Sequence, residues 1–250
     1  MDRFPREFAD LLTRKGRRIL DGRDPALKGA LADPTRHFIS ITGAIDPDKA
    51  RAAHGLLDRH LRRHLSPLSA PIPPGSIWNQ TRNYQERLPK TVRARTAYLE
   101  RRGTRAWRAA EAVGLIAMMR SGTFRAFAEM LAGRALDRTF GQQVLCYGPG
   151  DYAGPHTDHH PEDPRAAAGY IDLHVGLSNV DVAHQYLVYA RDGHFTEMVN
   201  VGGPGTITAY RLPFWHYTTP LVAKRGRVRT ARRWLLLGTF LFAGGSASRT

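Results

Sequence analysis

The chain has 250 residues and a mass of 27.9 kDa, and 42% of its residues are hydrophobic, which excludes a disordered protein and predicts one large domain or two small ones. The only cysteine, Cys146, excludes an internal disulfide framework and a cysteine-based zinc site. The formal net charge of +15 makes nucleic acid a possible partner, although dispersed basic residues also fit a solvated surface without a partner.

The sequence carries no sign of membrane targeting. Its first thirty residues contain charges throughout and no long apolar run, and no window approaches the length of an uncharged apolar span. We therefore expect no secretory signal peptide, no transmembrane helix, and a cytoplasmic location.

The N-terminal half is predicted to be mainly helical. An amphipathic pattern predicts a helix over residues 4–20, and alternation predicts a short strand over 37–43. Asp46 is placed to cap a helix that has Pro47 at its first position, and residues 66–75 are rich in turn formers. Further helices are expected at 91–101, at 104–119, and from a cap at Ser121 to Gly133.

From residue 140 onward, short apolar runs separated by turns predict strands. The expected strands are 140–147, 170–178, 184–190, 195–200, 206–211 and 234–242. Asp192-Gly193 predicts a hairpin turn between two of them. Helices followed by many short strands predict an α+β fold, in which an antiparallel sandwich or barrel packs against an N-terminal helical layer.

The stretch from Tyr147 to His160 is the strongest candidate for a site. It crosses a Gly/Pro turn and then places His156 and Asp158 two residues apart, so that on an extended backbone both point to the same side. His216, which follows a strand broken by Pro213, is the best third ligand. Two imidazoles and one carboxylate leave coordination positions open and suit non-haem Fe(II). The alternatives are a turn histidine with an Asx-turn aspartate, and a buried histidine at 216.

Other side chains near this stretch are ambiguous. His159, His160 and His174 could be further ligands or substrate contacts, but His159 and His160 fit a solvated loop better, and His174 fits packing on a strand better. Asp151 and Tyr152 fit either a turn or a contact with substrate, and Cys146 fits a small core residue.

Several features stand in a familiar order. Tyr147-x-x-Gly150 is followed after five residues by His156-x-Asp158, and Gly202–Gly205 leads into the strand before His216. The last strand opens with Arg232-Arg233-Trp234. This set resembles the catalytic barrel of the Fe(II)- and 2-oxoglutarate-dependent dioxygenases, especially their prolyl-4-hydroxylase-like branch, and the strand and helix at 37–61 resemble the element that precedes such barrels.

The resemblance implies a double-stranded β-helix (a jelly-roll, cupin-like barrel) over 138–243, with helical support over 44–134. It also implies a single oxygenase domain over 37–250 and an N-terminal helical extension over 1–36. Iron would be held by His156, Asp158 and His216, with 2-oxoglutarate as cosubstrate, dioxygen as oxidant, and ascorbate as a possible reductant.

In the resembled family a cation binds the distal carboxylate of 2-oxoglutarate. The closest spacing in the resembled branch would put this cation near Gly226 or Arg227, but residues 225–230 are too polar for an interior strand and fit an inserted loop. The longer interval found in nucleobase demethylases of the same superfamily implies Arg233 instead, beside Arg232. Side chains alternate along a strand, so only one of the two can face the barrel interior. We predict that this residue is Arg233, with Tyr147 as a second partner of the carboxylate.

The resemblance limits the possible substrate classes only in part. Prolyl-hydroxylase-like spacing implies hydroxylation of a protein or peptide, an amino acid or a small metabolite. A nucleic-acid demethylase is an alternative, although Leu145 and Thr239 stand where that branch has an asparagine and a second arginine. A basic nucleic-acid-binding protein on a metal-free barrel, and a zinc hydrolase using the same three ligands, are further alternatives.

Overall fold

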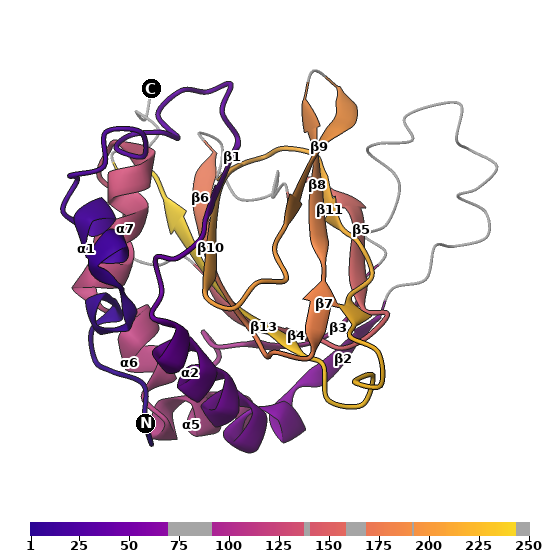
Figure 1. The fold of residues 1–250 in the computed structure, drawn as a ribbon. Coiled ribbons are helices and arrows are strands. Elements are labelled where there is room, and N and C mark those ends of the chain that lie inside the picture. The colour runs from indigo at the N-terminus through magenta and orange to yellow at the C-terminus, as the bar shows by residue number, and fades with distance from the viewer. Residues whose placement is uncertain (70–91, 138–140, 159–168, 192, 244–250) are drawn as a thin grey trace, which may run out of the picture.

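The computed structural model describes residues 1–69, 92–137, 141–158, 169–191 and 193–243 (Figure 1). In these ranges, eleven strands form one sheet that rolls into a nearly closed barrel. Its order is β1-β10-β6-β13-β4-β3-β5-β11-β8-β9, with β2 paired to β3, and β7 pairs separately with β12. All of these pairs are antiparallel.

The strands have the following bounds: β1 Phe38–Ile41, β2 Ser66–Ser69, β3 Val92–Tyr98, β4 Gly141–Tyr147, β5 Tyr152–His156, β6 Tyr170–Ser178, β7 Val182–His184, β8 Tyr186–Arg191, β9 His194–Asn200, β10 Thr206–Leu212, β11 His216–Thr218, β12 Val222–Ala223 and β13 Arg233–Leu241. The helices are η1 Phe8–Leu11, α1 Arg14–Leu20, α2 Pro47–His60, η2 Arg62–His64, α5 Arg105–Ala112, α6 Leu115–Met119 and α7 Gly122–Ala132. No helix in the described ranges is both long and apolar enough to cross a membrane.

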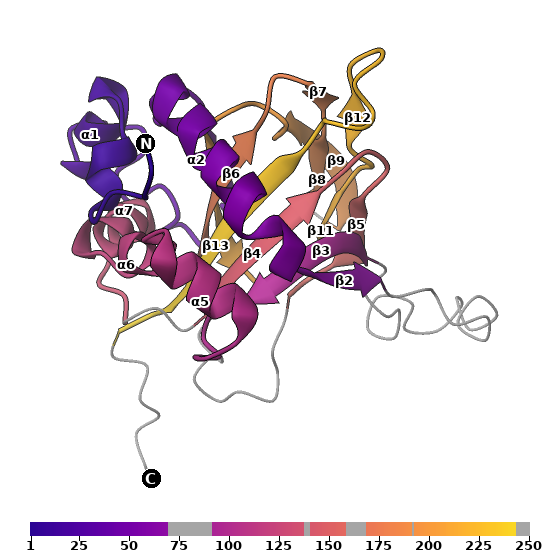
Figure 2. The ribbon, with the colours of Figure 1, turned by 90° about the horizontal axis from the view of Figure 1, so that it is seen from below.

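Helices cover one outer face of the barrel, as Figure 2 shows for α2, α5 and α6 beside β6, β13 and β4. The predicted caps are confirmed. The Asp46 carboxylate accepts hydrogen bonds from the N–H groups of residues 48 and 49, and Ser121 caps α7, which ends at left-handed Gly133. These local signals fix where the covering helices begin and end.

Alternation along β13 separates the helix-covered core from the barrel interior. Trp234, Leu236 and Phe240 pack in the core under the helices, whereas Leu235 and Leu237 line the interior cavity. The indole N–H of Trp234 donates to the Asp58 carboxylate of α2 at 3.0 Å, which ties this helix to the sheet.

The N-terminal segment packs on the same core as the helices. Phe8 makes edge-to-face contacts with Phe124 and Phe127 of α7, with ring centroids 5.2 and 5.6 Å apart. Leu11 and Ile19 are also fully buried in this core. The division into an extension over 1–36 and an oxygenase domain over 37–250 stays a prediction.

Three predictions of secondary structure were wrong in detail. Residues 91–101 do not form a helix, because β3 occupies Val92–Tyr98 and pairs with β4 and β5. The helix expected over 4–20 is η1 followed by α1, whose N-cap Thr13 interrupts it. The helix expected over 104–119 is broken at Gly114, which has a φ of 80°.

The predictions of strands agree with the structure more closely than the predictions of helices. Each predicted strand is present, β6 with the predicted ends and the others with shifted ends, while β5, β7, β11 and β12 were not predicted as strands. The turn-rich connection expected over 66–75 begins with β2 at Ser66–Ser69, and its residues from 70 on lie outside the described ranges. Residues 225–230 form turns, as expected of a loop. Asp192 of the predicted hairpin turn lies outside the described residues, but the flanking strands β8 and β9 are paired.

Candidate metal centre

Two neighbouring strands bring the three predicted ligands together. His156 ends β5 and His216 begins β11, and the two residues are direct cross-strand partners. Asp158 follows β5 with a φ of 53°, a left-handed conformation that is uncommon outside glycine. This turn brings its carboxylate back toward both rings.

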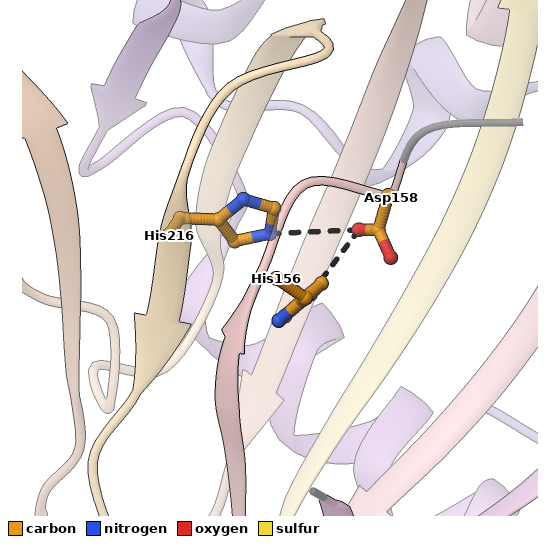
Figure 3. A group of neighbouring side chains, drawn as sticks. All are labelled: His156, Asp158 and His216. Atoms are coloured by element: carbon orange, nitrogen blue, oxygen red, sulfur yellow. Dashed lines mark ion pairs between the residues drawn. The ribbon is translucent and has the colours of Figure 1, made fainter. Parts of the chain in front are cut away.

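The side chains converge on one point (Figure 3). The Asp158 Oδ2 atom lies 3.3 Å from His156 Nε2 and 3.5 Å from His216 Nε2, and the ring centroids are 4.2 Å apart. The potential ligand atoms of all three residues lie within 4.8 Å of one another. His216 is buried, whereas His156 and Asp158 are partly exposed to the cavity.

Backbone carbonyls fix both imidazole rings. His156 Nδ1 lies 2.6 Å from the Gly154 oxygen, and His216 Nδ1 lies 3.0 Å from the Phe214 oxygen. A carbonyl can only accept, so each Nδ1 carries a hydrogen, which leaves Nε2 as the ring atom that can coordinate a metal. Such outer contacts orient metal ligands, and the donor set fits a divalent iron with open coordination positions.

Arg233 lies inside the barrel near this group. It is 2% exposed, donates to Gln185 Oε1 at 3.2 Å, and holds its guanidinium carbon 5.7 Å from the centroid of the buried Tyr147 ring. Within the described ranges it has no carboxylate partner, and its Nε has no hydrogen-bond acceptor. Burial lowers the pKa of Arg233, partly offset by Tyr147 and Tyr210. A buried cation without an anion is costly, so this position fits the carboxylate of a bound organic acid.

The other predicted site residues lie elsewhere. The side chain of Arg232 turns to the helix-covered side, where it donates to the Arg229 carbonyl and lies 3.9 Å from Asp58, so the structure does not place it with Tyr147 and Arg233. Asp151 accepts from the Gly148 N–H at 2.8 Å and pairs with Arg93 at 3.1 Å, contacts that stabilise the turn. His159 and His160 lie outside the described residues.

A cavity of about 500 Å³ adjoins the three ligands. It contains two buried side chains of β6: Asp172, which was not predicted as a site residue, and His174, for which packing on a strand was favoured over a contact with substrate. Polar residues alternate with apolar ones along this fully buried strand, which is the pattern that identifies them. Gln185, which holds Arg233, was also missed, since no sequence pattern links the two.

No known family model matches the sequence, and no curated protein matches it. Solved structures do match the fold. A prolyl-4-hydroxylase from Pseudomonas putida superposes with a TM-score of 0.50 and 16% identity, over 86% of this chain and 99% of that one. An oxidoreductase of the 2OG-Fe(II) oxygenase family from Burkholderia pseudomallei gives 0.52 and 12%, over 84% and 87%.

A third match is the non-haem α-ketoglutarate-dependent epimerase SnoN of nogalamycin biosynthesis, with a TM-score of 0.53 and 19% identity, over 88% of this chain and 84% of that one. The chain has the fold of the Fe(II)- and 2-oxoglutarate-dependent oxygenases. The predicted double-stranded β-helix is therefore confirmed, and in this oxygenase fold the His156, Asp158 and His216 cluster lies beside the interior cavity.

Proposed function

We propose that the protein is an Fe(II)- and 2-oxoglutarate-dependent dioxygenase that hydroxylates a small molecule, an amino acid, or a side chain of a peptide. The observation that carries the proposal is the convergence of two imidazole Nε2 atoms on the Asp158 carboxylate, beside a cavity of ligand size. Arg233, buried without an anion in the same barrel, supports 2-oxoglutarate as cosubstrate.

In this proposal His156, Asp158 and His216 hold the iron. When bound, iron with 2-oxoglutarate supplies the activation of dioxygen, coupled to decarboxylation of the oxo acid to succinate. The Gly154 and Phe214 carbonyls keep the two rings in the tautomer that leaves Nε2 available. The three ligands come from adjacent strands, so little rearrangement is needed to bind the metal.

Arg233 and Tyr147 orient the cosubstrate. The guanidinium offers two parallel N–H donors to a carboxylate, and Gln185 keeps it directed within the barrel. Tyr147 lies on the neighbouring strand as the direct partner of Arg233. The surrounding apolar side chains, among them Leu235 and Leu187, exclude water from this part of the cavity.

Hydroxylation is the finer part of the proposal, because the similar structures include an epimerase as well as a hydroxylase. The prolyl-4-hydroxylase-like order of motifs supports hydroxylation of a peptide or small molecule. No observation on the described residues favours the nucleic-acid alternatives over this one.

The test is succinate formation from 2-oxoglutarate with Fe(II) and ascorbate in air. We expect the wild type to form succinate above the protein-free background, and His156→Ala to lose this activity. His60→Ala, at an exposed position of α2, is the matched control and should behave as wild type. Equal background turnover of the wild type and His156→Ala would refute the proposal, and absence of bound iron after anaerobic reconstitution would favour the metal-free alternative.

A further inference from the structure

Asp172 and His174 form a polar patch on the wall of the cavity. Both lie on β6, where alternation turns them to the interior face together with Tyr170, and both are only 4% exposed. The intervening residues Ile171 and Leu173 pack in the core beneath the helices. The two polar residues are therefore held on a rigid, central strand.

Neither side chain is satisfied by the protein that surrounds it. Asp172 Oδ1 and both ring nitrogens of His174 have no hydrogen-bond partner among the described residues. The Asp172 Oδ2 to His174 Nε2 distance of 3.7 Å is too long for a hydrogen bond. Buried polar groups are normally paired, and leaving them unpaired costs free energy. We therefore expect these two side chains to form hydrogen bonds with a bound ligand.

The patch is close to the metal centre. The Tyr210 ring bridges the two groups, with centroids 4.4 Å from His174 and 5.2 Å from His216. Tyr170, two residues before Asp172, donates its hydroxyl to the backbone carbonyl of Asp158. A molecule that contacts Asp172 is thus held beside the proposed iron.

The described lining of the cavity includes three carboxylates, from Glu100, Asp158 and Asp172, although the chain carries a net charge of +15. The nearby cation is Arg233, which is not among the lining residues and whose charge is assigned above to the carboxylate of 2-oxoglutarate. Glu100 and Tyr98, which is 57% exposed, both line the cavity, and the Glu100 carboxylate accepts a hydrogen bond from the Gln142 N–H. Burial lowers the pKa of His174 and outweighs the opposing effect of the Asp172 carboxylate, which favours a neutral ring that can accept a hydrogen bond.

We propose that Asp172 and His174 bind a protonated nitrogen of the substrate, so that the oxygenase acts on an amine-bearing molecule or side chain. Two unsatisfied acceptors, a carboxylate and an imidazole, match the several N–H donors of one ammonium group. Glu100 attracts the same cation at the outer part of the lining. This inference rests on the proposed function for its role as substrate recognition, although the cation site itself is independent of turnover.

The test is binding of three probes with one ring and different charge: cyclohexylmethylamine, cyclohexylmethanol and cyclohexanecarboxylate. Titration calorimetry on the full chain at pH 7 is performed without metal, and again anaerobically with Fe(II) and 2-oxoglutarate. We expect the amine to bind at least about 10-fold more tightly than the alcohol, as for a charge-assisted buried hydrogen bond. Acetyl-Gly-Lys-Gly-amide, compared with its norleucine analogue, distinguishes a peptide side chain from a free amine.

Asp172→Asn should weaken amine binding by about 10- to 100-fold and leave alcohol binding unchanged. Glu100→Gln, at an exposed position, should weaken amine binding by about two- to fivefold. Asp48→Asn, an exposed carboxylate of α2, is the control and should have no effect. If Asp172→Asn does not fold, the inference is tested by two other results: the ratio of amine to alcohol affinity in the wild type, and the effect of Glu100→Gln on amine affinity.

The inference is overturned if the amine binds no more tightly than the alcohol, or if folded Asp172→Asn binds the amine as the wild type does. Succinate formation without added substrate reports on the proposed function separately. Charge-selective binding without succinate formation would support the cation site and reject the oxygenase. Succinate formation without charge-selective binding would support the oxygenase and reject the cation site.

Discussion

Arg233 and Tyr147 are direct partners across β13 and β4, and the guanidinium carbon of Arg233 lies 5.7 Å from the centroid of the phenol ring. At this distance the ring stabilises the cation without neutralising it. The charge therefore stays available for an anion inside the barrel. This pairing leads to the first prediction.

Arg233→Met is expected to raise the KM for 2-oxoglutarate by about 10- to 100-fold, because a charge-assisted hydrogen bond contributes roughly 1.5–3 kcal/mol. Arg233→Lys keeps the charge but loses the two parallel donors, so its KM should lie between those of Arg233→Met and the wild type. Initial rates of succinate formation at varied 2-oxoglutarate give these values. Arg227→Lys, in the exposed 225–230 loop, is the control. An unchanged KM in Arg233→Met would assign the carboxylate to another cation.

Iron binding is expected to stabilise the fold. At a free Fe(II) concentration of 100 times Kd, the free energy of unfolding should increase by about 2.7 kcal/mol, because the ligands assemble only in the folded state. For a chain of this size, that corresponds to a rise in Tm of roughly 5–10 °C. Anaerobic thermal unfolding measures the shift, which His216→Ala should abolish and His60→Ala should retain. A shift of the same size in His216→Ala would place the metal elsewhere.

Ser121 stabilises two backbone segments at once. Its hydroxyl oxygen accepts from the N–H of Phe124 in α7 and from the N–H of Phe8, each at 3.2 Å. Ser121→Ala should lower the free energy of unfolding by about 1–2 kcal/mol, since it removes a helix cap and leaves a second buried donor unpaired. Thr104→Ala, which removes a cap with one acceptor contact, is the comparison and should cost less. Urea unfolding measures both, and equal losses would contradict the double role.

Cys146 is expected to be inert in the folded protein. Burial raises the pKa of its thiol to about 12, with a smaller contribution from Asp58, so the reactive thiolate is scarce at pH 8. Because the folded pKa exceeds the ordinary thiol pKa of 9.0, the protonated thiol favours the folded state, and this contribution to stability is lost as pH rises from 9 toward 12. Labelling with a thiol reagent at pH 8 should be slow in buffer and fast in denaturant. Fast labelling in buffer would show that Cys146 is accessible.

The sequence brought out the candidate cluster through two local signals. His156 and Asp158 are close in the chain, and Pro213 marks the strand break before His216. It also predicted that one of two adjacent arginines faces inward, since alternation along β13 is a property of any strand. The helix caps at Asp46 and Ser121 could also be predicted, because each depends only on residues close in the chain.

The failures lie where distant pairing overrides local preference. Residues 92–98 contain alanine and arginine, which favour helices, yet β3 forms because it pairs with β4 and β5. β5 contains Gly154 and Pro155, which argue against a strand, but it is held between β3 and β11. The patch at Asp172 was missed because the inward face of β6 is defined only once the barrel closes.

His156 and His216 are each held by the carbonyl two residues before them, so the ring orientation of both candidate ligands is encoded within a three-residue segment. The middle residues, Pro155 and Trp215, contribute no group to these two contacts. Neither residue is among those that line the described cavity. Laboratory evolution that varies positions 155 and 215 is therefore expected to leave the direction of both imidazole rings unchanged.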